Sequence, residues 1–515
     1  MKPLSHRVSA SLLGLFILLS LVTVLRHEMW RDELQAWLLA KDQTSFANVA
    51  RAARYEKHPL AWFSILFLLS RLTHSPLAMQ LFHVGLAALS TWLVLRFAPF
   101  SPVQKVLLIF SYYLFFEYAV ISRNYALGVL SLFLFCVLLK REPPKLFRPA
   151  VCLFVLANTS LYGLLLAFAG GVAMLVRVLS DPAVRKKWAS YASLFLVIAG
   201  GILSLFSLMP VPDSYYPKAH TALQAERLSA VLSVLPKSFL PMPRPIFHFW
   251  NTSLLDKVPS RLPLNAVLAL LILVYAFALL RNSRLALVYY GLSTAGILAW
   301  SYVGSIGFTR HYGHLFITFI AALWLAGNSS ESLRASAGQT VRQAQISLLL
   351  SRILTGIIAV QASGGLFAVG MDIVHPFSQA KATAAYIKEK GYASLPIVGE
   401  MDYIMTPVAG YLGRKVYFVR GERLGSYVKW DKKRFQKVNI PLILERAEQY
   451  AWKKQKDCLI LLNFHLNPGL EQPGYLTRLL VTGPAIVAGE AYRLYLLNYT
   501  GLLSATPAQS RHPIR

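Results

Sequence analysis

The chain is poor in cysteine and in charged residues, the acidic ones above all. Three cysteines stand among 515 residues, and two of them, Cys136 and Cys152, fall in apolar stretches. The sequence therefore has neither a disulfide framework nor the Cys/His spacing of a zinc site. Charged residues make up 15% of the chain, with 23 Asp and Glu against 52 Lys and Arg. So little charge excludes a large soluble domain.

Long apolar runs take the place of charge. Hydrophobic residues are 56% of the chain, and several runs exceed the roughly 20 residues that cross about 30 Å of hydrocarbon. The net charge of +29 comes from Lys and Arg gathered in short segments between these runs. That is the positive-inside pattern, not a nucleic-acid patch. We expect an α-helical polytopic membrane protein that contacts membrane lipids and binds no nucleic acid.

The basic clusters predict the topology, because Lys and Arg mark the inner side. Crossings are expected at about 12–25, 77–95, 103–121, 124–140, twice within 148–177, then at 188–209, 263–281, 285–303, 309–327 and 348–371. The first is expected to be a retained helix, since no small-residue cleavage site follows it. Segment 58–72 is too short to cross and is predicted to lie at the interface. This gives about eleven crossings, with the N-terminus inside and the C-terminus outside.

Three further segments complete the predicted organisation. Outer loops are expected at 26–57 and 210–262, and an inner loop at 328–345. The transmembrane domain is expected to occupy 1–375.

The last 140 residues change character. Ser378 and Gly391 bound a predicted helix, short apolar runs follow at 395–398, 416–419 and 458–462, and a charged helical pattern covers 441–456. This alternation predicts a small α/β domain over 376–500, on the extracytoplasmic side, before a tail at 501–515.

An acidic pair, Asp32 and Glu33, follows the first apolar run directly. Ionisable groups at the edge of a membrane core are functional candidates. Neighbours on a helix point about 100° apart, so one is expected to face a reacting group while the other orients or binds. Partial burial of the facing carboxylate would make it a better base. The alternative is a helix N-cap with a salt bridge to Arg31 or Lys41.

Other polar groups fall on the same predicted outer face. The candidates for substrate binding are Glu56, His58, Arg123, Tyr125, Tyr162, Arg310 and His311. Arg310 with two histidines at a helix start would suit a phosphate, since the helix N-terminus favours an anion. The alternatives are a solvated loop for Glu56 and His58, headgroup contacts for Arg123, and a metal at the two histidines. Glu117, inside an apolar run, needs a partner.

Several of these stretches resemble one known family. They are Trp30-Arg31-Asp32-Glu33-x-Gln35-Ala36-Trp37, Tyr55-Glu56-x-His58-Pro59, Ser122-Arg123-Asn124-Tyr125-Ala126, Asn158-Thr159 and Arg310-His311. Together they resemble the GT-C type glycosyltransferases, in the family 39-like branch of protein O-mannosyltransferases and lipid A aminoarabinose transferases. The resemblance covers roughly residues 1–330.

The resemblance implies an inverting glycosyltransferase with a GT-C-like fold. Its donor would be a polyprenyl-phosphate sugar and its acceptor a hydroxyl of a glycan, lipid or protein. The catalytic residues would be Asp32, as the base, and Glu33, which would orient or bind the sugar or the acceptor. Arg123, Arg310 and His311 would stabilise the departing phosphate. Arg310 should then lie within roughly 15 Å of Asp32, the reach of an extended Arg, a phosphate and a sugar.

Neither a metal nor another cofactor is expected, because the acidic ligands of metal-dependent members have no equivalent in later loops. The membrane would be a bacterial inner membrane, with the site on its outer face. The competing interpretations are a flippase or transporter of a lipid-linked saccharide, and a glycan polymerase or ligase. Transporters place ionisable residues near the bilayer midplane. Candidates gathered on one face favour the enzyme.

Overall fold

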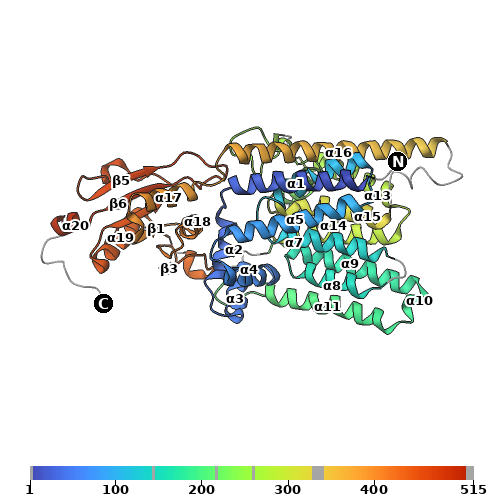
Figure 1. The fold of residues 1–515 in the computed structure, drawn as a ribbon, viewed down its shortest axis with the longest axis horizontal. Coiled ribbons are helices and arrows are strands. Elements are labelled where there is room, and N and C mark those ends of the chain that lie inside the picture. The colour runs from blue at the N-terminus through green and yellow to red at the C-terminus, as the bar shows by residue number, and fades with distance from the viewer. Residues whose placement is uncertain are drawn as a thin grey trace.

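The computed structural model describes residues 4–141, 145–214, 219–257, 261–327, 341–435 and 437–505. Most of the predicted inner loop 328–345 and of the tail 501–515 lies outside these residues. A bundle of long helices carries a small α/β domain at one end (Figure 1). We call this end of the bundle the domain end. The N-terminus lies toward the opposite end (Figure 1).

Among the described residues, seven helices are long and apolar enough to cross a membrane. They are α1 (His6–Arg26), α5 (Leu77–Phe97), α9 (Leu161–Ser180), α11 (Trp188–Leu208), α13 (Leu262–Leu280), α14 (Arg284–Val303) and α16 (Val341–Val374). The chain is therefore an integral membrane protein, as the composition indicated. The predicted count of eleven crossings stays a prediction, because the other helices are shorter or less apolar.

Shorter helices fill the bundle between the long ones. They are α7 (Tyr125–Leu139), α8 (Phe147–Ala157) and α15 (Thr309–Ala326), with α10 (Pro182–Arg185) in a connection. The predicted hairpin turns where expected, because Ser160 accepts a hydrogen bond from the Gly163 N–H and so begins α9. The predicted interfacial segment 58–72 forms α4 (Ala61–Leu72), with 12 residues.

The expected continuous span at 103–121 is wrong. The chain forms α6 (Pro102–Ile109), breaks, and continues as a π-helical turn, η2 (Tyr112–Glu117). The Ser111 hydroxyl accepts the Leu114 N–H and caps the second piece. A Cβ added to Gly365 of α16 would lie 2.5 Å from the Phe110 carbonyl oxygen. An apolar run cannot reveal such a break, since the cap and the glycine contact stabilise it, not hydropathy.

The predicted outer loop 210–262 also holds more structure than expected. It contains α12 (Ala225–Phe239) and a short turn, η3 (Leu254–Lys257). Helix α12 packs on the bundle, where Phe239 contacts the rings of Phe316 and Phe319. Gln361 of α16 donates to the carbonyls of Ser238 and Phe239, which lie in the last turn of α12 and have no partner within the helix. Proline concealed this helix at the sequence level.

The C-terminal region is an α/β domain, as predicted. Its described strands form one sheet in the order β3-β2-β1-β4-β6-β5. The strands are β1 (Ile397–Gly399), β2 (Val416–Phe418), β3 (Arg423–Gly425), β4 (Cys458–Leu462), β5 (Leu476–Val481) and β6 (Arg493–Leu497). The helices are α17 (Ala380–Glu389), α18 (Asp402–Leu412), α19 (Ile440–Lys454) and α20 (Tyr499–Ala505). The three predicted strands are the parallel core β1, β2 and β4.

The first loop is folded between the bundle and this domain. It forms α2 (Arg31–Lys41), α3 (Phe46–Ala53) and a short turn, η1 (Arg54–Glu56). Helix α2 packs against both α4 and α18. The Met29 N–H donates to the Tyr411 hydroxyl at 2.8 Å, and the Arg31 N–H donates to Glu490. The acidic pair therefore lies at the junction of the two domains.

Candidate active site

Helix α2 begins at the acidic pair because Glu33 caps it. The Glu33 carboxylate accepts the Trp30 N–H at 3.2 Å, which satisfies one of the unpaired donors of the first turn. Both carboxylates of the pair also favour the positive end of the helix dipole. The chain therefore turns into a helix directly after α1, and the two neighbours face different ways.

Glu33 faces the protein interior and is fully buried. Its Oε1 accepts the Ser122 N–H at 2.7 Å, and its Oε2, which also accepts the Trp30 N–H, lies 2.9 Å from His27 Nε2. The other His27 nitrogen lies 2.8 Å from Asp372 of α16. Glu33 thus joins α2 to the segment before α7 and, through His27, to α16. These contacts fix the orientation of Glu33 itself, and its expected part in orienting or binding a substrate stays a prediction.

Asp32 faces the opposite way and lies between two arginines. Its Oδ2 is 3.0 Å from Arg123 and 3.2 Å from Arg310. Arg310 is 278 positions away in the chain, and its distance from Asp32 is far inside the 15 Å expected. Burial alone would raise the pKa of Asp32, but the two guanidinium groups hold that pKa below its usual range. The side chain is still 30% exposed, so a ligand can reach it.

A small cavity opens beside Asp32. It is lined by Asp32, Ala36, Glu56, His58, Trp62, Phe63, Arg123 and Asn124. Burial raises the pKa of Glu56 to about 7, although Gln35 donates to it at 2.6 Å. Burial and the charge of Arg123 lower the pKa of His58 to about 3, and His58 Nδ1 is buried without a hydrogen-bond partner. A neutral imidazole and a protonatable carboxyl therefore line the space that Asp32 faces.

Aromatic rings fix the Arg310 guanidinium. It lies 5.3 Å from the Trp30 ring, 5.5 Å from the Trp250 ring and 4.8 Å from the Phe308 ring. The side chain is only 7% exposed, and its Nε has no hydrogen-bond partner. Trp250 also donates to Glu117 at 3.1 Å, so it supplies the partner that this buried carboxylate required. The sequence analysis missed Trp250, since one tryptophan in a long loop carries no signal of its own.

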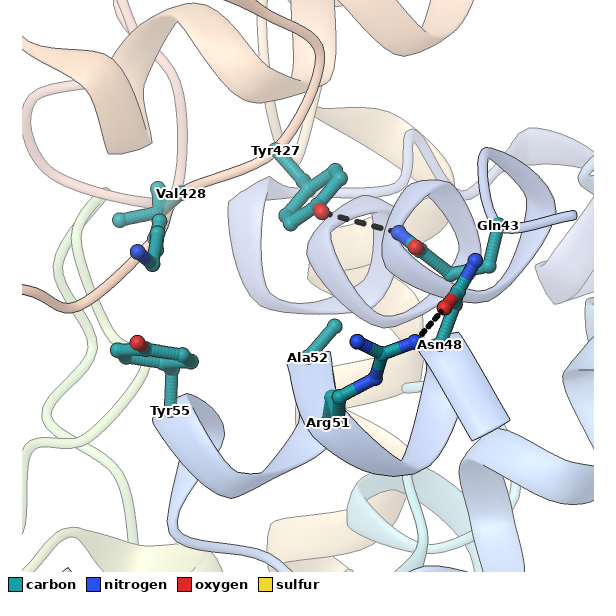
Figure 2. A pocket seen from close by; sticks show the side chains of 8 residues that line it. Gln43, Asn48, Arg51, Ala52, Tyr55, Tyr427 and Val428 are labelled. Carbon is teal, nitrogen blue, oxygen red and sulfur yellow. Dashed lines mark hydrogen bonds between the residues drawn. The ribbon is translucent and has the colours of Figure 1, made fainter. Parts of the chain in front are cut away.

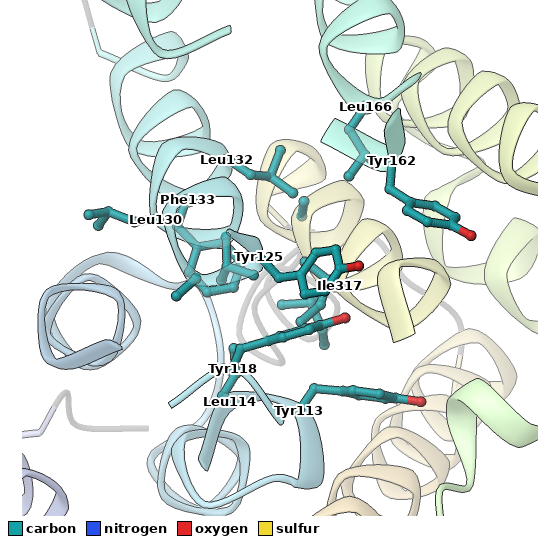
Figure 3. Packing of buried hydrophobic residues seen from close by; sticks show 14 of the residues in the cluster. Tyr113, Leu114, Tyr118, Tyr125, Leu130, Leu132, Phe133, Tyr162, Leu166 and Ile317 are labelled. Carbon is teal, nitrogen blue, oxygen red and sulfur yellow. The ribbon is translucent and has the colours of Figure 1, made fainter. Parts of the chain in front are cut away.

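Two tyrosines and two histidines stack beside the arginines. The Tyr162 ring lies parallel to those of His311, at 5.5 Å, and His314, at 4.9 Å. Tyr125 meets the His311 and His314 rings edge-on. Figure 3 shows Tyr125 and Tyr162 in the packed aromatic region that continues to Tyr118. Because this stack joins α7, α9 and α15, the predicted residues of three separate segments come together.

The histidines serve the start of α15. His311 Nδ1 accepts the Phe308 N–H at 2.9 Å, and His314 Nδ1 lies 2.9 Å from the His311 carbonyl oxygen. With Nδ1 accepting, the neutral His311 ring carries its hydrogen on Nε2, which can donate to a phosphate. The described residues contain no group of three or more His, Cys, Asp or Glu side chains placed to hold a metal.

All the predicted site residues lie at the domain end of the bundle. Seven of them are reached from Asp32 through a chain of direct contacts or a shared cavity: Glu56, His58, Arg123, Tyr125, Tyr162, Arg310 and His311. Glu33 joins them through Ser122. The arrangement offers one accessible carboxylate, two rigid cations and a neighbouring cavity. It defines an anion-binding site with an acid–base group, built into a membrane protein.

Comparison with solved structures finds likenesses that cover nearly the whole chain. The chain is similar to crystal structures of ArnT from Cupriavidus metallidurans. The apo structure has a TM-score of 0.46 at 14% identity and covers 97% of this chain and 99% of that chain. The structure bound to undecaprenyl phosphate has a TM-score of 0.49 at 13% identity and covers 95% and 97%.

No protein-family model matches the chain, and no curated protein matches it in sequence. With both TM-scores below 0.5, the function proposed below rests on the site itself.

Proposed function

We propose that this protein is a glycosyltransferase that moves a sugar from a polyprenyl-phosphate donor to an acceptor hydroxyl, with inversion. The observation that carries the proposal is Asp32 held between Arg123 and Arg310 beside a cavity. A base and a pair of phosphate-binding cations are the two parts that such a transfer requires. The sequence motifs around these residues support the same reaction. We place the site on the outer face of a bacterial inner membrane, because the basic clusters mark the other side.

The charged residues of the site act on different parts of the substrates. Asp32 takes the proton of the acceptor hydroxyl as its oxygen attacks the anomeric carbon. The bond from that carbon to the phosphate oxygen breaks, and the phosphate leaves with the electron pair. Arg123 and Arg310 bind the charge that develops on the phosphate. The products are the glycosylated acceptor and polyprenyl phosphate, and Asp32 then returns its proton to water.

Because the pKa of Asp32 is low, we propose that the bound donor also makes Asp32 a stronger base. With both arginines paired to it, the carboxylate is a weak base. A donor phosphate placed between the same guanidinium groups offsets their charge, so the pKa of Asp32 rises toward its usual value when the donor is bound. The aromatic rings around Arg310 keep its fork in place during this exchange. Activation of the acceptor therefore depends on a bound donor.

Asp32→Asn provides the direct test. The amide cannot take the proton, and loss of a positioned base costs roughly 10²–10⁴-fold in turnover. We expect the variant, purified from the membranes of its own source, to retain the donor, seen by mass spectrometry as a polyprenyl phosphate carrying one sugar. The wild type should retain mainly polyprenyl phosphate, the product. Arg281→Lys, an exposed cation at the end of α13, is the matched control.

Two results would contradict the proposal. One is an Asp32→Asn variant with more than about a tenth of wild-type turnover. The other is a pair of preparations in which neither wild type nor variant retains a polyprenyl lipid. A flippase would give a further pattern, with sugar-bearing lipid bound equally by both proteins and no new glycoside.

A further inference from the structure

A second, larger pocket lies where the first loop meets the C-terminal domain. It is lined by Gln43, Asn48, Arg51, Ala52, Tyr55, Tyr427, Val428 and Lys429. Figure 2 shows Tyr427 and Val428 descending from the C-terminal domain toward Arg51, Ala52 and Tyr55 on the helical turns below. The pocket has a volume of about 240 Å³ and is open to solvent. That volume is somewhat smaller than the roughly 300–1,000 Å³ of typical small-molecule sites.

The lining combines three kinds of group. Arg51 and Lys429 are cations, Tyr55 and Tyr427 present rings with hydroxyls, and Gln43 with Asn48 adds amides. Rings pack against the C–H faces of a sugar, and amides and hydroxyls both donate to and accept from its hydroxyls. Among the residues that the structure describes, no carboxylate belongs to the lining. The pocket therefore suits a saccharide that carries negative charge, not a neutral or cationic one.

The side chains around the pocket are held in place by their neighbours. Tyr55 donates to Asp213 at 2.7 Å, and Lys429 lies 4.5 Å from the Tyr55 ring and 3.4 Å from Asp213. Gln43 donates to the Tyr427 hydroxyl at 2.9 Å.

Arg51 is the cation that remains available to a ligand. Its guanidinium donates to Asn48, and no salt bridge joins it to a carboxylate in the part of the chain that the structure describes. An anion in the pocket would therefore meet a charge that is not already neutralised.

The pocket shares a wall with the cavity beside Asp32. Tyr55 lines the pocket, and the next residue, Glu56, lines the cavity. Gln35 closes the gap between them, since it donates to Glu56 at 2.6 Å and to the Val428 carbonyl at 2.8 Å, and accepts the Val428 N–H at 2.7 Å. A ligand in the pocket lies one side-chain layer from the proposed base.

We propose that this pocket binds the anionic part of the acceptor, that the acceptor is a saccharide bearing a phosphate or another anionic substituent, and that its reacting hydroxyl extends out of the pocket to Asp32. Arg51 holds the substituent, and the two tyrosines hold the sugar ring. This inference rests on the proposed function, because it names the substrate that Asp32 would deprotonate. A lipid head group and a free oligosaccharide offer the same chemistry.

The first experiment measures binding to the full chain in detergent by saturation-transfer NMR and titration calorimetry. The probes are glucose 6-phosphate, glucose and inorganic phosphate. We expect glucose 6-phosphate to bind more tightly than either of the others. Arg51→Gln should weaken that binding by about tenfold, the loss of one charge-assisted hydrogen bond. Lys454→Gln, an exposed cation on α19, should leave it unchanged.

The same probes can overturn the proposal. Inorganic phosphate bound as tightly as glucose 6-phosphate would show an anion site without sugar recognition. If glucose bound as tightly as glucose 6-phosphate, the negative charge of the ligand would have no part in binding. If Arg51→Gln bound glucose 6-phosphate with wild-type affinity, the ligand would not bind in this pocket. Octadecyl glucoside 6-phosphate in phosphatidylcholine nanodiscs separates the two sources. Tighter binding than the free sugar identifies a lipid-borne acceptor, and equal binding a soluble one.

The two proposals can fail separately. Donor trapping by Asp32→Asn does not involve the pocket, and probe binding does not require turnover. If Asp32→Asn retained no donor but probe binding depended on Arg51, the pocket would bind an anionic sugar and the protein would have another function. A successful trap with Arg51-independent binding would leave the transferase with its acceptor site elsewhere.

Discussion

Arg310 has the most constrained side chain of the site. Three rings surround its guanidinium, and one nitrogen reaches Asp32. A lysine at this position would keep the charge but lose both the planar stacking and the two-pronged grip on phosphate oxygens. Charge alone therefore does not describe what this residue contributes.

We expect Arg310→Lys to lose retained polyprenyl lipid by at least tenfold while its thermal stability stays near that of the wild type, since hydrogen bonds to charged groups are worth roughly 1.5–3 kcal/mol. Quantitative mass spectrometry of bound lipid and a melting curve give the two readouts. Arg281→Lys is the matched control. Equal lipid retention in both variants would show that the fork does not hold the phosphate.

Glu56 predicts a pH dependence of stability. Its pKa is raised from 4.5 to about 7 by burial, so the folded protein binds a proton here that the unfolded chain has released. The stabilisation is complete below the unfolded pKa and is lost as the pH rises through about 7. Glu56→Gln should therefore gain stability relative to the wild type between pH 5 and 8. Melting curves at pH 5 and pH 8 measure this, with Glu445→Gln on α19 as the control. A difference in melting temperature between Glu56→Gln and the wild type that was the same at both pH values would contradict the prediction.

At the residue scale, sequence reasoning found the carboxylates and cations but not their supports. Asp32, Arg123 and Arg310 stand beside apolar runs, where charge is conspicuous. Trp250 and Gln35 act through contacts that no local pattern encodes. The inward face of Glu33 was anticipated only as one of two possibilities, because the Ser122 N–H that selects it lies 89 positions away.

Helix α2 connects the two domains through Gln35. Its amide makes three hydrogen bonds, two to the Val428 backbone and one to Glu56. Gln35→Ala would leave the buried Val428 N–H and carbonyl unpaired, which costs about 1–3 kcal/mol. We expect a lower melting temperature and easier proteolysis between α16 and α17. Gln449→Ala, whose partners are on the surface of α19, should melt like the wild type, and an equal shift in both would argue against the connection.

At the scale of elements, periodicity predicted the long helices and the parallel core strands. It could not predict the break at Ser111, since hydropathy is the same on both sides of the break. Helix α12 was missed because Pro236 lies inside its last turn. The strands β3, β5 and β6 were missed because their partners, not their own sequences, define them.

At the scale of the whole molecule, the basic clusters predict that the domain end faces outward. Ser75, exposed before α5, should then be outside, and Ser180, exposed at the end of α9, inside. With the three cysteines replaced, Ser75→Cys should react with an impermeant maleimide in intact cells and Ser180→Cys only after lysis. The reverse pattern would invert the topology and contradict the outer location of the site.

The interlock between α16 and the broken span bears on how the protein is made. Gln104 of α6 donates to Thr355, 251 positions later in the chain, and Gly365 lies against the break itself. Asp372 of the same helix meets His27, at the end of the first helix. During synthesis, α16 must leave the ribosome before Thr355 and Gly365 can pack against the break between α6 and η2. Only then can Asp372 also contact the buried His27–Glu33 pair. The domain end therefore matures last, although its acidic pair leaves the ribosome among the first residues.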